Sequence, residues 1–278
     1  MIKSILLPID GSAYTDSVIE YGIFMGRKFD AVLRVLTIVD IRLFDWSLSS
    51  GADSFVPIMP SPEFQEESQK LQQEKAVHVL KKAAEILNRS AVKFETFKRA
   101  GIPVDEICNM ARQADMVVMG IRGEYERWSD KLLGVTVEAV TRQINKSVLL
   151  IDKVFKPIER IHVGYDGSDT ANKALQLAAE MSTILSLPLE VIAVFDSKDE
   201  RNAVLDEAER YLLPYNLNYA LRPETGDVVE VLVAAQKKAP KPALTVIGSY
   251  GHSRLREAII GSTTVEVMRK SSPVLLAK

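Results

Sequence analysis

The sequence lacks the features that would define a secreted or membrane-bound protein. It contains a single cysteine, Cys108, so no disulfide can form within the 278-residue chain. No apolar run approaches the roughly 20 residues that span a bilayer. The N-terminal segment, residues 1–10, lacks the length and the small-residue cleavage site of a signal peptide. We therefore expect a cytoplasmic protein with no membrane partner.

An excess of one charge is also absent, because the formal net charge is −2. No strong field attracts nucleic acid or anionic lipid, and neither is a predicted partner. Apolar residues make up 47% of the chain and charged residues 26%. This balance is typical of a globular protein with a sizeable core, and the length suits two domains of about 140 residues each.

The chain contains an internal repeat. Four short segments recur in the same order: Ile5–Ser12 as Ile161–Ser168, Met116–Gly123 as Leu244–Gly251, Leu132–Gly134 as Ile259–Gly261, and Ser147–Leu150 as Pro273–Leu276. Recurrence in a fixed order indicates one structural unit used twice. We predict one domain over residues 1–152 and a second over residues 158–278. The first copy is about 28 residues longer, which places an insertion at about 41–69.

Apolar runs and helical patterns alternate through both copies, which predicts parallel strands joined by helical crossovers. Each copy begins with an unbroken apolar run, typical of a strand buried on both faces. The predicted fold class is α/β: two tandem, open, doubly wound sheets, each of five mostly parallel strands flanked by helices. The longest predicted helix spans residues 62 to about 88, and Ser12 and Ser168 are candidate helix caps. Ligands of such sheets bind at the carboxyl ends of the strands, where the strand order reverses.

The loop after the fourth strand of the second copy carries a phosphate-binding pattern. It contains Gly248-x-x-Gly251, nine further residues, and then Gly261-Ser262-Thr263 at the start of a helix. Glycines let backbone N–H groups approach an anion, and a helix N-terminus adds donors and the positive end of its dipole. The pattern is not a P-loop, because no Gly-Lys-Ser/Thr follows, and a plain turn is the alternative interpretation. Three further side chains of the loop could supply positive charge: His252, Arg254 and Arg256.

With these motifs the chain resembles a tandem universal stress protein. The nucleotide-binding branch of that family has the loop Gly-x2-Gly-x9-Gly-Ser/Thr, which Gly248, Gly251, Gly261 and Ser262 match at full spacing. The resemblance implies an adenine nucleotide alpha hydrolase-like fold and an adenine nucleotide as ligand, ATP, ADP or AMP, with Mg²⁺ accompanying ATP. It assigns Asp166 and the backbone of Val194 to the base and ribose. It assigns the phosphates to Gly251, Gly261, Ser262 and Thr263.

The first copy departs from this pattern. Its counterpart residues are Asp10, Ile38, Gly120, Gly123, Gly134 and Thr136. Ten residues separate its second and third glycines, and Val135 replaces the hydroxyl side chain. Its loop also contains three carboxylates, which repel phosphates unless neighbouring Arg or Lys side chains offset them. We therefore predict that a nucleotide binds chiefly in the second copy.

Nothing in the sequence points to a dedicated enzyme. It has no His-Glu metal motif and no Gly-x-Ser-x-Gly, and His78 and His162 fall within a predicted helix and a predicted strand. We predict no catalytic residue and no metal site. Three functions stay open: a stress-response regulatory protein that binds an adenine nucleotide, a scaffold protein that acts through the insertion, and a weak ATPase. The first is preferred.

The insertion and the last strands bear on assembly. Residues 41–60 include many large apolar side chains, which is unusual for a disordered segment. They predict a loop that folds over either copy, or a lid or docking surface for an unknown protein partner. The resemblance implies that Ser147–Ile151 and Pro273–Ala277 pair within the chain and make an intrachain pseudo-dimer. The sequence leaves open whether two chains also form a homodimer.

Overall fold

The computed structural model of this protein describes residues 1–43, 62–123, 133–249 and 261–278. Its strands, in chain order, are β1 (Ser4–Pro8), β2 (Val32–Asp40), β3 (Phe94–Gly101), β4 (Met116–Gly120), β5 (Ser147–Ile151), β6 (Arg160–Gly164), β7 (Leu189–Val194), β8 (Tyr219–Glu224), β9 (Ala243–Gly248) and β10 (Val274–Ala277). Its α-helices are α1 (Thr15–Phe29), α2 (Pro62–Asn88), α3 (Pro103–Ala111), α4 (Val135–Gln143), α5 (Asp169–Leu185), α6 (Lys198–Leu212), α7 (Val228–Lys238) and α8 (Ser262–Lys270). Two short 3-10 helices, η1 (Ile41–Leu43) and η4 (Leu213–Tyr215), follow β2 and α6.

The strands form one sheet in the order β3-β2-β1-β4-β5-β10-β9-β6-β7-β8. The order within the first five strands repeats in the second five, and the strand pairs within each half are parallel. The halves meet where β5 pairs with β10 antiparallel, with Leu149 opposite Leu275. The predicted parallel α/β fold and the pairing of the last strands are thus confirmed, and this pairing joins the two five-stranded sheets into one.

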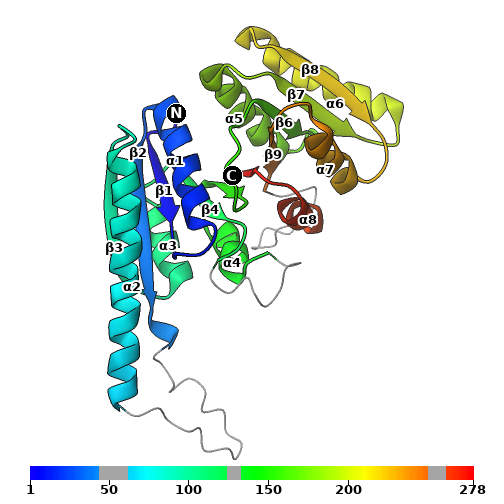
Figure 1. The fold of residues 1–278 in the computed structure, drawn as a ribbon. Coiled ribbons are helices and arrows are strands. Elements are labelled where there is room, and N and C mark those ends of the chain that lie inside the picture. Colours follow the sequence, from blue (N-terminus) through cyan, green and yellow to red (C-terminus); the bar gives the residue numbers. More distant parts are fainter. Residues whose placement is uncertain (44–61, 124–132, 250–260) are drawn as a thin grey trace, which may run out of the picture.

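Helices cover both faces of this sheet (Figure 1). One buried apolar cluster contains side chains of α1, α2, α5 and α6, and the other contains side chains of α3, α4, α7 and α8. Leu6 and Leu7, neighbours on β1, point into opposite clusters, and both are fully buried. Unbroken apolar runs are therefore needed in the central strands, because each face of the sheet is a core.

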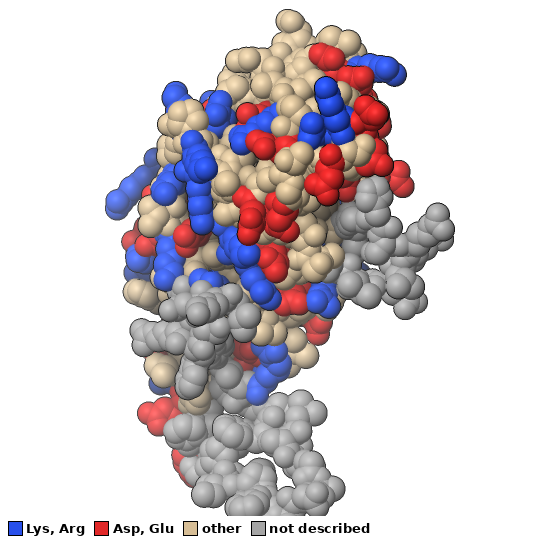
Figure 2. Space-filling view, turned by 90° about the vertical axis from the view of Figure 1, so that its right-hand side faces the viewer, with Lys and Arg blue, Asp and Glu red and all other residues tan. Residues whose placement is uncertain are grey.

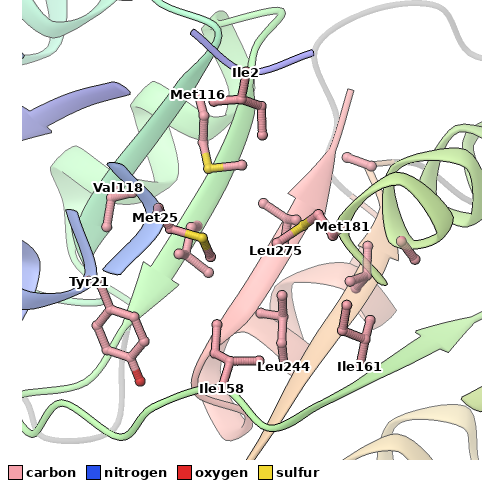
Figure 3. Close-up of a cluster of buried hydrophobic side chains, with 14 of the residues drawn as sticks. Ile2, Tyr21, Met25, Met116, Val118, Ile158, Ile161, Met181, Leu244 and Leu275 are labelled. Atoms are coloured by element: carbon pink, nitrogen blue, oxygen red, sulfur yellow. The ribbon is translucent and has the colours of Figure 1, made fainter. Parts of the chain in front are cut away.

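The first apolar cluster is continuous across the junction of the halves. Figure 3 shows Met25 of the first half and Met181 of the second on either side of Leu275. A hydrogen bond from the Tyr21 hydroxyl to the carbonyl of Lys156 (3.1 Å) also ties α1 to the segment that connects the halves. The two halves therefore share one buried apolar cluster.

The long helix α2 begins and ends as predicted, at Pro62 and Asn88. Its N-terminal turns extend past the carboxyl ends of β2 and β3 (Figure 1). The strand β3 pairs with β2 along its whole length, and residues 99–101 continue this parallel pairing as far as Asp40. The apolar residues 44–60 of the insertion lie outside the described residues. No helix in the described part of the chain combines the length and apolarity needed to cross a membrane.

The two predicted helix caps differ. Ser168 caps α5, since its side chain accepts a hydrogen bond from the N–H of Ala171. The prediction for Ser12 is wrong, because α1 starts later, after the uncapped residue Tyr14. Ser12 is instead part of the turn that precedes the helix, where its N–H and carbonyl bond to Asp10 and Thr15.

Candidate functional site

The order in which successive strands are added to the sheet reverses at two places. In the first half β1 lies between β2 and β4, and in the second half β6 lies between β7 and β9. The switch points are therefore between β1 and β4 and between β6 and β9. Crevices outside the carboxyl ends of strands at such points are the usual ligand sites of open α/β sheets.

Matching turns leave the first strand of each half. Gly11 and Gly167 have φ angles of +80° and +76°, which only glycine adopts without strain. In the first turn Oδ1 of Asp10 accepts a hydrogen bond from the N–H of Ser12 (2.9 Å). In the second, Oδ1 of Asp166 accepts the equivalent bond from Ser168 (3.0 Å). The turns therefore fix both carboxylates at the carboxyl edge of the sheet.

A cavity of about 530 Å³ lies at the switch point of the first half. All six residues predicted for this half line it: Asp10, Ile38, Gly120, Gly123, Gly134 and Thr136. They come from the ends of β1, β2 and β4 and from the start of α4, segments far apart in the sequence. The cavity size is in the range of small-molecule sites.

The cavity wall is largely apolar, with charged groups at a few points. Side chains of Ile107, Met119 and Leu133 contribute to it, together with residues of β1 and β2. Gly120 lets the chain pass closely, because a Cβ there would lie 2.6 Å from the Tyr14 side chain. At the mouth, Val135 is 86% exposed in the first turn of α4. The site thus combines an apolar interior with a helix N-terminus at its rim.

Sequence reasoning missed several polar residues of this wall, among them Asp40, Arg42 and Gln72. The Arg42 guanidinium holds the Asp40 carboxylate, with Nη2 2.6 Å from Oδ2 and Nε 3.0 Å from Oδ1. The N–H of Arg42 also donates to Oδ1 (3.0 Å), which starts η1. The Asp-x-Arg pattern at a strand end was the available signal, since Asp side chains commonly bond the N–H two residues later. Gln72 reaches the cavity from the long helix α2, which no local pattern reveals.

In the second half most of the predicted residues lie at the equivalent edge. Asp166 follows β6, Val194 ends β7, Gly248 ends β9, and Gly261 directly precedes α8. Ser262 and Thr263 are exposed in the first turn of α8, and within the described residues no side chain caps that helix at Gly261. Gly248 lies so close to the first turn of α5 that a Cβ on this residue would be 2.7 Å from the carbonyl of Thr170. Gly251 and the loop residues 250–260 lie outside the described residues.

The two described histidines lie in a helix and in a strand, not in the turns that leave the strands. His78 is exposed on α2, and His162 is 1% exposed within β6. Nε2 of His162 lies 3.4 Å from Oε2 of Glu190, yet neither ring nitrogen makes a hydrogen bond. Burial lowers the pKa of His162, and the attraction of Glu190 opposes this only in part. Within the described ranges no three His, Cys, Asp or Glu side chains gather where they could hold a metal ion.

An open, doubly wound sheet with a ligand-sized cavity at its switch point places this chain among the α/β proteins that bind ligands at the carboxyl ends of their strands. Comparison with known families identifies the family to which this chain belongs. The model of the Universal stress protein family matches residues 1–152 and again residues 157–278. The chain therefore belongs to the Universal stress protein family, with two family units in one chain.

Individual relatives agree with this assignment. Universal stress protein Slr1230 of Synechocystis sp. is 29% identical over 285 residues, covering 99% of both chains. Universal stress protein Rv1996 of Mycobacterium tuberculosis is 23% identical and covers 99% of this chain and 94% of its own. The crystal structure of a universal stress protein from Archaeoglobus fulgidus superimposes with a TM-score of 0.76 at 24% identity, covering 99% and 96% of the two chains. This last likeness supports the fold alone.

Proposed function

We propose that this protein is a stress-response regulator that binds an adenine nucleotide, ATP, ADP or AMP, chiefly in its second half. The observation that carries the proposal is the cavity of the first half, which has six motif residues in its wall at the switch point. The second half has the same strand order and the full Gly-x2-Gly-x9-Gly-Ser motif in sequence. A cavity in one copy supports a site at the same place in the other.

The second half has the better chemistry for phosphates. Gly261 has no side chain to cap the first turn of α8, and we propose that the N–H groups and dipole of this turn bind an anion. Ser262 and Thr263 add exposed hydroxyl groups in the same turn. We propose that Asp166 and Val194 contact the base and ribose, and that Gly248, Gly251, Gly261, Ser262 and Thr263 surround the phosphates.

We propose binding rather than dedicated turnover as the function. A hydrolytic site needs a positioned base and charge neutralisation near the phosphates, usually from a metal. His78 is exposed on α2 and His162 is buried within β6, and neither lines the first cavity, so we propose neither as a base. Any Mg²⁺ would enter with ATP. Ligand occupancy would then alter the glycine-rich loop and the binding of a protein partner.

Matched substitutions of equivalent residues test this proposal. Thr263→Trp fills the rim of the second site, and Thr136→Trp fills the cavity of the first. Calorimetric titration with ATP, ADP and AMP, with and without Mg²⁺, should show at least a 100-fold loss of affinity for Thr263→Trp. Thr136→Trp should retain the nucleotide affinity of the unaltered protein. Thermal melting of each variant controls for folding.

Two results would overturn the proposal. If the unaltered chain binds none of the three nucleotides, the scaffold function through the insertion takes its place. If Thr263→Trp binds ATP as tightly as the unaltered chain, the main site is not in the second half. Phosphate release in the same samples measures whether slow hydrolysis accompanies binding.

A further inference from the structure

The charges in the wall of the first cavity balance one another. The described residues that line it include two carboxylates and two guanidinium groups: Asp10, Asp40, Arg42 and Arg122. Their formal charges cancel, and none of the described lining residues is a lysine. Among the described lining residues, no net positive charge is therefore present to offset a phosphate chain with several negative charges.

The Asp40–Arg42 pair leaves little positive charge for a ligand. Both carboxylate oxygens of Asp40 accept hydrogen bonds from the Arg42 guanidinium, and the side chain of Asp40 is only 16% exposed. Bidentate bonds of this kind are among the strongest polar contacts in proteins. A ligand phosphate would have to compete with a carboxylate that the backbone holds in place.

A second carboxylate lies against the loop where a phosphate would bind. Oδ2 of Asp10 is so close to Gly123 that a Cβ on this glycine would lie 2.7 Å from it. Gly123 is the second glycine of the first loop, the position assigned to phosphate contact in the other half. Negative charge next to this backbone weakens the attraction of its N–H groups for an anion.

The rim of the cavity also lacks a counterpart of the Ser262 hydroxyl of the second half. Val135 stands at the position of Ser262 and presents a branched apolar side chain that is 86% exposed. The N–H of Gly134, directly before it, donates to the carbonyl of Ile121 (3.0 Å) and is not available to a ligand. The first turn of α4 therefore offers an anion fewer hydrogen-bond donors than its alignment with the first turn of α8 predicts.

The remaining features of the cavity suit an uncharged ligand. Ile38, Ile107 and Met119 provide apolar surface that would bury a ring. The carboxylate of Asp10 can accept hydrogen bonds from hydroxyl or amino groups of the same ligand. We infer that the cavity of the first half is a site for an uncharged nucleoside-type ligand and disfavours polyphosphates. This inference rests on the proposed nucleotide function of the fold, and it assigns the two halves different ligand classes.

Adenosine is the probe that tests the inference, and the Thr263→Trp chain is the protein to titrate. Calorimetry should detect adenosine binding to this variant at least tenfold tighter than ATP binding. The double variant Thr136→Trp/Thr263→Trp should lose the adenosine. Val135→Trp, at a strongly exposed residue of the cavity rim, replaces Thr136→Trp as the blocking change if that variant melts early.

The outcomes separate this inference from the proposed function. Failure of adenosine to bind Thr263→Trp overturns the inference, as does equal or tighter binding of ATP to that variant. Both results leave ATP binding to Thr136→Trp, which tests the proposed function, unaffected. Loss of ATP in Thr136→Trp alone would overturn both, because the first cavity would then be the nucleotide site.

Discussion

The two halves of the molecule have the same strand order but differ in the residues buried on one face of the sheet. This face packs against α3 and α4 in the first half and against α7 and α8 in the second. In the first half, β1 and β4 place Leu6 beside Val117, and both are fully buried. In the second half, β6 and β9 place His162 beside Thr245 at the equivalent positions. The ring nitrogens of His162 and the hydroxyl of Thr245 make no hydrogen bond. The fold therefore tolerates a polar pair where its first copy has an apolar one.

The halves also differ at the carboxyl edge, where ligands of this fold bind. After β2 the chain forms η1, and Arg42 holds Asp40 at the cavity. After β7 the chain enters α6 at once, with Ser197 as its cap. Of the described residues of the insertion, Arg42 thus contributes to the wall of the first site. Duplication kept the sheet and left both the core and the edge free to diverge.

The largest expected effect is on stability, and it comes from the substitution that makes the buried strand pairs of the two halves alike. Replacing His162→Leu together with Thr245→Val transfers the apolar pair of the first half into the second. Each buried polar group without a hydrogen bond costs about 1–3 kcal/mol, so we expect the double variant to be about 2 kcal/mol more stable. Urea unfolding at pH 7 measures the change in midpoint. The reciprocal control, Leu6→His, should destabilise the chain, and a loss of stability in the double variant would contradict the prediction.

The same variant should change the pH dependence of stability. Burial, followed by the repulsion of Arg160 and Arg222, lowers the pKa of His162 below its ordinary value of 6.5 despite the neighbouring Glu190. Between the lowered pKa and 6.5 the unfolded chain binds more protons than the folded chain, so acid favours unfolding. Stability of the unaltered protein should therefore fall as the pH drops below about 6.5. His162→Leu should remove this part of the acid sensitivity. Above pH 7 the substitution should leave the slope of stability against pH unchanged.

Much of the fold could be predicted, because its signals are local and repeated. The long helix Pro62–Asn88 was predicted with both of its ends, and Ser168 was predicted as the cap of the helix that is now α5. The pairing of β5 with β10 came from the resemblance rather than from any pattern in the strands. Each of these features depends on residues close together in sequence or on a known relative.

The site could be predicted only where its residues belong to a motif. Asp10 and Gly134 were found because their positions recur in the second copy. Arg42 and Gln72 were not, because their place in the cavity wall depends on how η1 and α2 return to the sheet. Ser12 was misassigned because the same residue types build a cap and a tight turn. Gly251 lies outside the described residues, so its role stays a prediction.

An intermediate effect is expected from exchanging the rim residues of the two sites. Ser262→Val should weaken ATP binding about tenfold, because one hydrogen bond to a charged group contributes about 1.4 kcal/mol. Val135→Ser should strengthen ATP binding at the first site by a similar or smaller factor, best measured in the Thr263→Trp chain. Both residues are exposed, so neither change should disturb folding. Unchanged ATP affinity for Ser262→Val would show that this hydroxyl does not contact the phosphates.

The smallest effect concerns the first helix of each half. Ser168 has extended backbone angles (φ −70°, ψ 159°), and its hydroxyl accepts a hydrogen bond from Ala171 at the start of α5. Removing such a cap costs about 1 kcal/mol, so Ser168→Ala should lower the free energy of unfolding by that amount.

Ser12→Ala is the matched change in the first half, and it should cost less than half as much. The cap position of α1 is Tyr14, which has helical backbone angles and no side-chain cap. The Ser12 hydroxyl accepts only a longer bond from the N–H of Tyr14 (3.3 Å), outside the first turn of the helix. The turn is also held by the side chain of Thr15, which accepts a bond from Gly11 (3.0 Å). Urea midpoints of the two variants decide the comparison: equal losses would mean that Ser12 stabilises its helix as Ser168 does, despite its different position in the chain.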